Sequence, residues 1–175
     1  MRVGIVSDSH DNLKGLKWAF TELQSMGVDK VLHLGDIISP FVPLRLREFY
    51  NGDLWAITGN NDGDHIHLSR NFEKAGFHLF TEEQAFVVLG GKNIVMMHEP
   101  RLLDEFAASG EFDLVLYGHT HERNLRKVRN ALIINPGELY GYISGTVSFA
   151  VVDLEEMKVD FYEKEVSEVE RIPLR

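Results

Sequence analysis

The chain has 175 residues, the length of one domain with a core of its own. Its 27 acidic and 18 basic residues give a formal net charge of −9, which disfavours binding to nucleic acid and to anionic membranes. The absence of cysteine excludes disulfides and thiolate metal ligands, and no segment has the pattern of a signal peptide or a membrane span, so we expect a cytoplasmic protein.

The first two thirds of the chain alternate strand-like and helical patterns, which predicts βα units and a parallel or mixed sheet. Apolar, β-branched runs predict strands at 3–6, 30–34, 53–57, 85–89, 93–97 and 113–117. Helical spacing predicts a helix from Leu13 that ends before Gly27, a second after Pro43, and others at 65–75 and 102–109.

Strands dominate the last third of the chain. They are predicted at 125–128, 131–134, 146–152 and 158–162, separated by "RN", "NPG" and "EEM". These separators suggest antiparallel strands joined by turns. We expect a single domain at 1–166 and a C-terminal tail at 167–175.

Polar residues follow the ends of five predicted strands. The segments are "SDSH" after the first strand, "LGDI" after the second, "TGNND" after the third, "MMHEP" after residue 95 and "YGHTH" from residue 117. Ligand sites of open α/β sheets gather at the carboxyl ends of strands, so we expect these segments to converge.

Two histidine-containing pairs have the spacing of metal ligands. Asp8 and His10, like His119 and His121, are two residues apart, which places both side chains on one side of an extended backbone. Either pair alone is a weak signal, because such residues also serve turns and surfaces. Without cysteine, carboxylate, amide oxygen and imidazole are the groups left to bind a hard or borderline divalent metal.

Together these segments resemble the calcineurin-like metallophosphoesterases, whose ordered motifs are D-x-H, GD, GN[H/C]D, a lone histidine after a strand, and GHxH. The chain looks most like the small, cap-free YfcE-type phosphodiesterase branch, which tends to carry a turn like that of Asn135, Pro136 and Gly137. The resemblance covers most of the chain. It implies an α/β fold, a four-layer α-β-β-α sandwich with two mixed β-sheets.

The resemblance also implies a dinuclear metal centre in which Asp36 bridges both ions. The implied ligands are Asp8, His10, Asp36 and His121 for one ion, and Asp36, Asn60, His98 and His119 for the other. Mn²⁺ is the leading candidate, with Ni²⁺, Fe²⁺, Co²⁺ and Zn²⁺ as alternatives. Such a centre activates water, or a bridging hydroxide held by Asp36, for attack on a phosphodiester.

Asn61 departs from the family pattern, because many relatives carry a histidine at this position. A histidine there can protonate a leaving oxygen, whereas an asparagine amide can only hydrogen-bond a phosphate oxygen. We therefore predict that Asn61 contacts the substrate phosphate. We also predict that esters with poorly acidic leaving groups react more slowly than activated nitrophenyl esters.

The other histidines and the loop aspartate have weaker claims to function. His65 or His67 can be considered as a replacement acid, but both are predicted on a helix, where a spacing of two points them apart. Asp62 suits a turn or a hydrogen bond that orients the loop. His33 is predicted to be structural, and His78 belongs to no constellation.

Two departures from the family pattern and a pair of tyrosines leave specificity open. Glu99 follows His98 where relatives often have glycine, and it either faces the substrate or starts the following helix. Glu138 stands where serine is common in relatives. Tyr140 and Tyr142 either line the substrate mouth or pack in the fold.

Two alternative functions are a protein-binding scaffold and a nuclease. A scaffold resembling the retromer subunit of this fold would bind protein without catalysis, although such a role would be favoured by degraded metal motifs. A nuclease would need clustered basic residues, and only 123–129 is basic, so nucleic acid is an unlikely partner. We expect a small phosphodiester substrate, no membrane partner, and a homodimer or homotetramer as the assembly.

Overall fold

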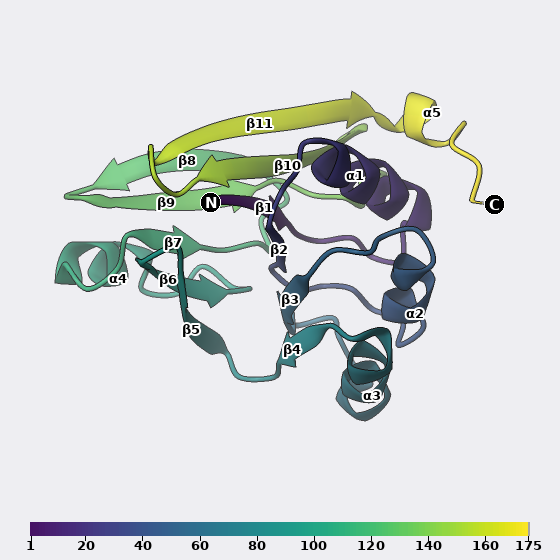
Figure 1. Cartoon of the computed structure of the whole chain (residues 1–175), viewed down its shortest axis with the longest axis horizontal. Helices are drawn as coiled ribbons and strands as arrows, with labels where there is room; N and C mark the ends of the chain where they lie inside the picture. Colours follow the sequence, from purple (N-terminus) through teal and green to yellow (C-terminus); the bar gives the residue numbers. More distant parts are fainter. Residues whose placement is uncertain (175) are drawn as a thin grey trace.

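The computed structural model describes residues 1–174 and contains two mixed β-sheets (Figure 1). The first sheet has the order β11-β10-β1-β2-β3-β4, and the second has the order β5-β6-β7-β9-β8. The strands of the first sheet are β1 (Arg2–Val6), β2 (Lys30–His33), β3 (Leu54–Ile57), β4 (His78–Phe80), β10 (Thr146–Asp153) and β11 (Lys158–Glu165). Those of the second sheet are β5 (Gln84–Leu89), β6 (Lys92–Met97), β7 (Leu114–Leu116), β8 (Arg123–Val128) and β9 (Ala131–Pro136).

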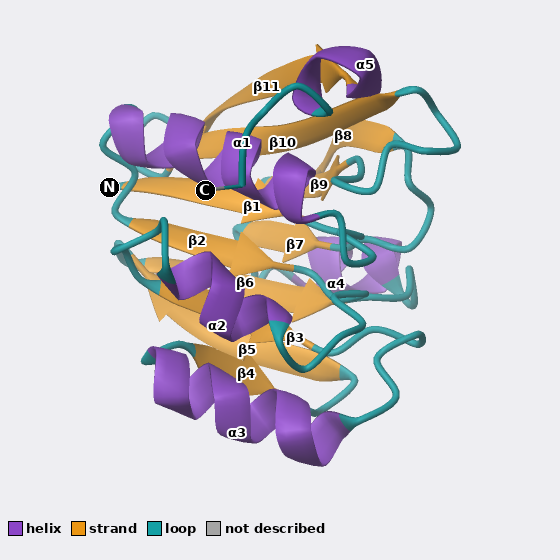
Figure 2. Cartoon of the chain, turned by 90° about the vertical axis from the view of Figure 1, so that its right-hand side faces the viewer, coloured by secondary structure: helices purple, strands orange, loops and turns teal. Residues whose placement is uncertain are grey.

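Helices cover the outer faces of the two sheets and complete four layers. The helices are α1 (Leu13–Ser25), α2 (Val42–Arg47), α3 (His65–Ala75), α4 (Leu103–Ser109) and α5 (Val166–Val169). Figure 2 shows α1, α2 and α3 on the near side of the first sheet, with α4 behind the second sheet. The predicted four-layer sandwich is therefore confirmed.

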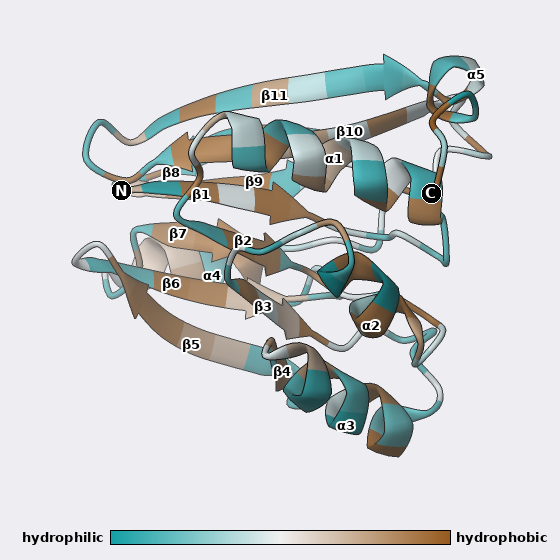
Figure 3. Ribbon diagram, turned by 45° about the vertical axis from the view of Figure 1, so that its right-hand side comes forward, coloured by the Kyte–Doolittle hydropathy of each residue, from teal (hydrophilic) through white to brown (hydrophobic). Residues whose placement is uncertain are grey.

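Alternation along the strands builds three apolar clusters. Between the sheets, Ile5, Leu32 and Ile57 pack with residues of the second sheet such as Met96 and Leu116. A second cluster lies between the first sheet and α1 to α3, and a third lies between the second sheet and α4. In Figure 3 inner strands such as β1 and β6 are mostly brown, that is hydrophobic, whereas the edge strand β11 is largely teal or white. Both faces of the central strands are buried, so their loops are held in fixed positions.

Local signals explain where the longer helices begin and end. The Asn12 side chain accepts a hydrogen bond from the Gly15 backbone N–H (3.0 Å) at the start of α1. Asp64 accepts one from the His67 N–H (3.1 Å) at the start of α3, which ends at Gly76 in the left-handed region (φ 69°).

The parallel core of the first sheet matches its βα prediction. Strands β1 to β4 are parallel, whereas β10 is antiparallel to β1 and to β11. β8 and β9 form the predicted antiparallel hairpin. The "NPG" segment, however, is not a turn between paired strands, because β9 belongs to the second sheet and β10 to the first. That part of the prediction is wrong.

Two short elements lie outside the predicted ones. β4 has three residues and pairs with β3, and α5 includes Val169, which is buried against the cluster beneath α1. The predicted tail at 167–175 thus includes most of α5, and its last residue, Arg175, lies outside the described residues. The division into a domain at 1–166 and a tail stays a prediction. Within residues 1–174, no helix has the length and apolar character needed to cross a membrane.

Candidate metal centre

The seven predicted ligands lie in loops that follow five strands. Asp8 and His10 follow β1, Asp36 follows β2, Asn60 follows β3, His98 follows β6, and His119 and His121 follow β7. Hydrogen bonds join these loops within each sheet, from Asp8 N–H to Gly35 O (3.0 Å) and from Gly118 N–H to His98 O (3.0 Å), and also between the sheets, from His119 N–H to Asp8 Oδ2 (3.0 Å). Loops from both sheets thus meet, and Figure 2 shows them at one edge of the sandwich.

The backbone of these loops is strained at the predicted ligands. Five of the seven have positive φ, a conformation that is uncommon outside glycine: Asp8 (51°), His10 (37°), Asp36 (58°), His119 (68°) and His121 (60°). Each such residue costs on the order of 1 to 3 kcal/mol, and strain of this kind gathers at functional sites. The folded structure therefore holds these side chains in place against a local preference.

Two glycines allow the loops to approach so closely. A Cβ on Gly59 would lie 2.2 Å from Asp36 Oδ1, and one on Gly118 would lie 2.1 Å from Ser7 Oγ and 2.8 Å from Asp8 Oδ2. Neither distance is possible for an ordinary side chain. The glycines of "TGNND" and "YGHTH" are thus required by packing beside the two buried carboxylates.

The first group of side chains surrounds the carboxylates of Asp8 and Asp36. His121 Nε2 lies 3.5 Å from Asp8 Oδ1, and His10 Nε2 lies 4.0 Å from the same atom and 3.4 Å from Asp36 Oδ2. One ligand atom from each of Asp8, His10 and His121 falls within 4.8 Å of the others. This is a grouping able to hold a metal ion.

The second group is tighter. Asn60 Oδ1 lies 2.9 Å from both His98 Nε2 and His119 Nδ1, and those two nitrogens are 3.3 Å apart. His98 Nε2 is also 3.4 Å from Asp36 Oδ2, and Asp8, Asp36 and His98 form a second grouping able to hold a metal.

The donor set fits cations at both groups. His98 Nδ1 donates to Leu34 O (2.8 Å), because a carbonyl oxygen only accepts, so a neutral ring turns its Nε2 lone pair toward Asn60 Oδ1 and Asp36. Asp8 Oδ1 and His10 Nε2 are buried without a hydrogen-bond partner among the described residues. Acceptors that face each other, and buried polar atoms that lack partners, are costly without a positive charge between them. A bound divalent cation would supply that charge.

The pKa shifts of Asp36, His98 and Asp8 also arise from burial and from the close approach of these groups. Burial alone would raise the pKa of Asp36, but hydrogen bonds from Asn61 and, in its protonated form, from His98 outweigh burial and hold that pKa below its usual range. Burial would lower the pKa of His98, yet the Asp36 carboxylate beside it raises the pKa above its usual value. At Asp8 burial dominates and raises the pKa. Asp36 is thus the carboxylate most firmly held in the ionised form that a metal requires.

Comparison with known proteins identifies the family. Residues 1–157 match the calcineurin-like phosphoesterase superfamily domain. The phosphodiesterase MJ0936 of Methanocaldococcus jannaschii is 33% identical over 160 residues, which cover 89% of this chain and 95% of that protein. The solved structure of a novel archaeal phosphodiesterase superposes with a TM-score of 0.87 at 30% identity, covering 94% of this chain and all of that one. The Escherichia coli phosphoesterase YfcE shares the fold, with a TM-score of 0.66 at 17% identity over 95% of this chain and all of that one.

The chain belongs to the calcineurin-like phosphoesterase superfamily. The predicted superfamily is confirmed, and the similarity to phosphodiesterase MJ0936 and to the archaeal phosphodiesterase structure supports the predicted phosphodiesterase branch. All seven predicted ligands are of metal-binding residue types, and the structure brings them together. The ligand set itself stays a prediction.

Asn61, the residue that departs from the superfamily histidine, contacts Asp36. Its backbone N–H donates to Asp36 Oδ1 (2.9 Å) and its side-chain Nδ2 donates to Asp36 Oδ2 (2.7 Å). The sequence did not indicate this contact. The second amide hydrogen has no partner in the described part of the chain, so the predicted contact with a substrate phosphate remains compatible with the geometry.

Asp62 organises the loops of this centre, as predicted. It is 3% exposed, and its Oδ2 accepts from the N–H groups of Asp36 (3.0 Å) and Gly59 (2.8 Å). Its Oδ1 accepts from Ile37 (2.8 Å) and Ile38 (2.7 Å). One carboxylate thereby fixes the loop after β2 to the loop after β3.

Glu138 is the residue whose role the sequence reasoning missed. Its side chain is buried, and Oε2 accepts a hydrogen bond from His121 Nδ1 (2.7 Å), which leaves Nε2 to face Asp8. A carboxylate on the outer nitrogen of a ligand histidine fixes the tautomer and raises its basicity. The available signal was a glutamate in place of a small serine directly after "NPG".

The "NPG" segment supports the last ligand loop. Asn135 Nδ2 donates to Gly118 O (2.9 Å) and to Thr120 Oγ1 (3.0 Å), and Asn135 Oδ1 accepts from Gly137 N–H (2.9 Å). The segment therefore braces "YGHTH" while the chain crosses from the second sheet to the first.

The remaining histidines lie outside the centre. His33 is buried, and its Nε2 lies 3.0 Å from Ser9 Oγ, so its predicted structural role is confirmed. His67 is exposed and contacts Asp64 at the start of α3 (2.8 Å). His65 is the first residue of α3, and His78 lies in β4, against Trp55 and Phe80.

Glu99 faces a cavity and does not start a helix, because α4 begins only at Leu103. Its carboxylate accepts from the Arg101 side chain (2.8 Å), which lowers the pKa of Glu99. Tyr140 packs against His10, with ring centroids 5.2 Å apart, and Tyr142 donates its hydroxyl to Glu170 (2.6 Å).

Proposed function

We propose that the protein is a phosphodiesterase with a dinuclear metal centre and that it hydrolyses small or nucleotide-type phosphodiesters. The enzyme class, a hydrolase of phosphoric diesters, is established by membership of the superfamily and by the similarity to phosphodiesterase MJ0936. One observation carries the finer proposal: side chains from five loops of both sheets converge with their metal-binding atoms facing one another.

The proposal assigns each residue of the centre to one ion, to both ions or to the substrate phosphate. Asp8, His10, Asp36 and His121 would hold one ion, while Asp36, Asn60, His98 and His119 would hold the other. When bound, the two ions lower the pKa of water, orient it for in-line attack and neutralise the phosphate oxygens. Asn61 keeps Asp36 oriented and offers its free amide hydrogen to a phosphate oxygen.

Charge favours a diester over a monoester. Asp8, Asp36 and the buried Glu138 place three carboxylates in and beside the centre. Before a hydroxide binds, two divalent ions among three carboxylates leave a net charge of about +1, which balances a singly charged diester better than a doubly charged monoester.

Nucleic acid is the less favoured substrate. On the basic strand β8, Arg123 pairs with Glu163 (2.6 Å) and Arg126 pairs with Asp104. These arginines are therefore partly neutralised, while polynucleotide binding depends on free, clustered cations.

Three further features belong to this proposal. We propose Mn²⁺ as the working metal, with Ni²⁺, Fe²⁺, Co²⁺ or Zn²⁺ as alternatives, and a cytoplasmic location. We also propose a homodimer or homotetramer that uses the edge strand β5, where Phe86 and Val88 are 59% and 65% exposed. Light scattering of the wild type and of Phe86→Lys tests the assembly, and equal masses for the two would argue against β5 as the interface.

Hydrolysis by the purified protein tests the proposed function. After removal of metal with chelator and addition of Mn²⁺, we expect bis(p-nitrophenyl) phosphate to be cleaved faster than p-nitrophenyl phosphate. Asp36→Asn should lose at least about 100-fold in kcat/KM, and the exposed Glu73→Gln serves as the control. No metal-dependent cleavage, together with a stable partner protein, would favour a scaffold. Faster, salt-sensitive cleavage of DNA or RNA would favour a nuclease.

A further inference from the structure

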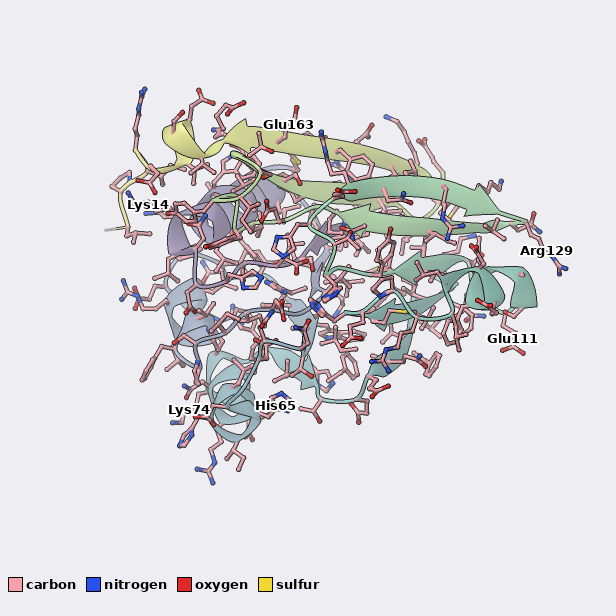
Figure 4. All side chains as sticks on the ribbon, turned by 180° about the vertical axis from the view of Figure 1, so that it is seen from behind. Lys14, His65, Lys74, Glu111, Arg129 and Glu163 are labelled. Carbon is pink, nitrogen blue, oxygen red and sulfur yellow. The ribbon has the colours of Figure 1, made fainter. Side chains whose placement is uncertain are left out.

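A cavity of about 190 Å³ opens directly beside the candidate metal centre. Two predicted ligands, Asn60 and His98, line it, so the cavity lies within reach of a substituent on a phosphorus held at the centre. Its other walls come from the start of α3, the connection between β4 and β5, and the segment that follows β6. Figure 4 shows His65, which contributes to the α3 wall, at the end of that helix nearest this connection.

The rim of this cavity is acidic. Glu82, Glu83 and Glu99 bring three carboxylates to it, and Arg101 is the one lysine or arginine among its described lining residues. The Arg101 guanidinium donates to Glu99 (3.1 and 2.8 Å) and lies 3.6 Å from Glu83. Its charge is thus already shared between two carboxylates. Among residues 1–174, no basic side chain lies within salt-bridge distance of Glu82.

The size of the cavity limits what can enter. Pockets that enclose drug-sized ligands measure about 300–1,000 Å³, so this one suits a substituent of only a few atoms. Its wall includes the buried, apolar Met97 together with Thr58 and Gln84, which combine an apolar surface with hydroxyl and amide groups. A small polar alcohol matches these walls.

We propose that this cavity binds one alcohol of the phosphodiester and selects a small amino alcohol or neutral polyol over an alcohol that carries a further anion. The inference rests on the proposed function, because the phosphate must be held at the metal centre for its alcohol to reach the cavity. A cationic amine gains attraction from the rim, whereas an additional carboxylate or phosphate meets repulsion. Glu83 has a side chain that is 82% exposed, so solvent weakens each contribution.

Binding of three phosphomonoesters of similar size tests the inference, because each offers a single alcohol. Phosphoethanolamine, glycerol 1-phosphate and 3-phosphoglycerate are titrated by calorimetry into the Mn²⁺-loaded protein, with inorganic phosphate as the reference that lacks an alcohol. Relative to phosphate, we expect phosphoethanolamine to bind most tightly and 3-phosphoglycerate to bind at least about fivefold more weakly than phosphoethanolamine.

Variants test whether the acidic rim residues cause the preference for phosphoethanolamine over 3-phosphoglycerate. In Glu82→Gln/Glu83→Gln the ratio between phosphoethanolamine and 3-phosphoglycerate should fall at least about threefold. Glu111→Gln, at the far end of the molecule in Figure 4, should leave the ratio at the wild-type value. Equal affinities for the three esters, or a ratio that is the same in the double variant, would overturn the inference.

The same protein separates this inference from the proposed function. If bis(p-nitrophenyl) phosphate is cleaved with Mn²⁺ but the three esters bind alike, only the role of the cavity is wrong. If the esters are discriminated as expected while no cleavage occurs, the cavity assignment stands and the catalytic proposal fails. If neither phosphate nor any ester binds the metal-loaded protein, both fail.

Discussion

At the scale of single residues, Asn61 separates this chain from many superfamily members. Its amide hydrogen-bonds Asp36 but cannot supply a proton to a leaving alkoxide. We predict that Asn61→His raises kcat/KM for diesters with alkyl leaving groups by about 10- to 100-fold, because imidazole titrates near neutral pH. For nitrophenyl esters, whose leaving groups need no proton, the gain should be below about threefold. A series of diesters with different leaving groups, assayed at saturating Mn²⁺, measures how kcat/KM depends on the pKa of the leaving group.

Asn61→Ala is the control for this substitution, since it also removes the contact to Asp36 without adding an acid. If Asn61→His and Asn61→Ala have the same dependence on leaving-group pKa, a proton donor is not what the wild type lacks. A flat dependence in the wild type would mean that another acid, such as His65, already acts.

Glu138 is predicted to strengthen metal binding through its hydrogen bond with His121. Its buried carboxylate holds His121 Nδ1 at 2.7 Å, and loss of such a partner typically weakens metal binding by 10- to 100-fold. Glu138→Gln should therefore raise the Kd for the weaker-bound Mn²⁺ about 10-fold in calorimetry, while circular dichroism confirms an intact fold. Glu122→Gln, an exposed neighbour of His121, is the matched control. Unchanged affinity in Glu138→Gln would contradict a direct influence on the ligand.

His33 is predicted to make stability depend on pH. Burial lowers the pKa of His33 from 6.5 to about 3, so the unfolded chain binds the proton more tightly than the folded protein. The neutral His33 therefore contributes to the free energy of unfolding in full above pH 6.5. This contribution is lost as pH falls toward 3, at up to about 1.4 kcal/mol per pH unit. In urea unfolding with chelator, the free energy of unfolding should fall less steeply between pH 7 and 4.5 for His33→Gln than for the wild type. Parallel profiles would show that His33 does not titrate this way.

At the scale of elements, the loops after β2 and β3 depend on Asp62. Four backbone N–H groups donate to its carboxylate, and an asparagine would turn an NH₂ group toward two of them. Asp62→Asn should lower the free energy of unfolding by about 3 kcal/mol in chelator, measured with urea. Asp64→Asn, which keeps a capping oxygen at α3, should change it by less than about 1 kcal/mol. Similar effects of the two substitutions would rule out a special role for Asp62.

The regular elements were largely predictable because their signals are local. Apolar periodicity marked the strands of both sheets, and helix α3 has the predicted bounds of 65–75. β4 was missed because its three residues are too few for a pattern and include the exposed His78. The path of "NPG" from one sheet to the other depends on which strands pair, and that is decided by the whole fold.

The site was predictable only in part, for a related reason. The positions of Asp8, Asp36 and the "GHTH" histidines follow from ordered motifs, and the resemblance of those motifs to a known family implied that they meet. The contact from His121 to Glu138 joins loops that no motif pairs. Contacts of this kind are set by tertiary geometry, so a single sequence carries little trace of them.

At the scale of the whole molecule, the candidate centre joins the two sheets. Asp8, Asp36 and Asn60 follow strands of the first sheet, whereas His98, His119 and His121 follow strands of the second. An ion held by both sets binds only when the sheets are docked, so its binding energy adds to the free energy of unfolding. At a free Mn²⁺ concentration of 100 times Kd the gain is about 2.7 kcal/mol.

We therefore predict that Mn²⁺ raises the Tm of chelator-treated protein by about 5 to 10 °C, as expected for a domain of this size. Because an ion held by ligands of both sheets would link them, amide exchange should slow in β6 and β7 as much as in β1 and β2. Asp36→Asn should lose most of the shift, since Asp36 lies between both groups, and Glu73→Gln should keep it. Protection confined to the first sheet would mean that the ion is held by that sheet alone, and an unchanged Tm would mean that the converging side chains do not form a metal centre.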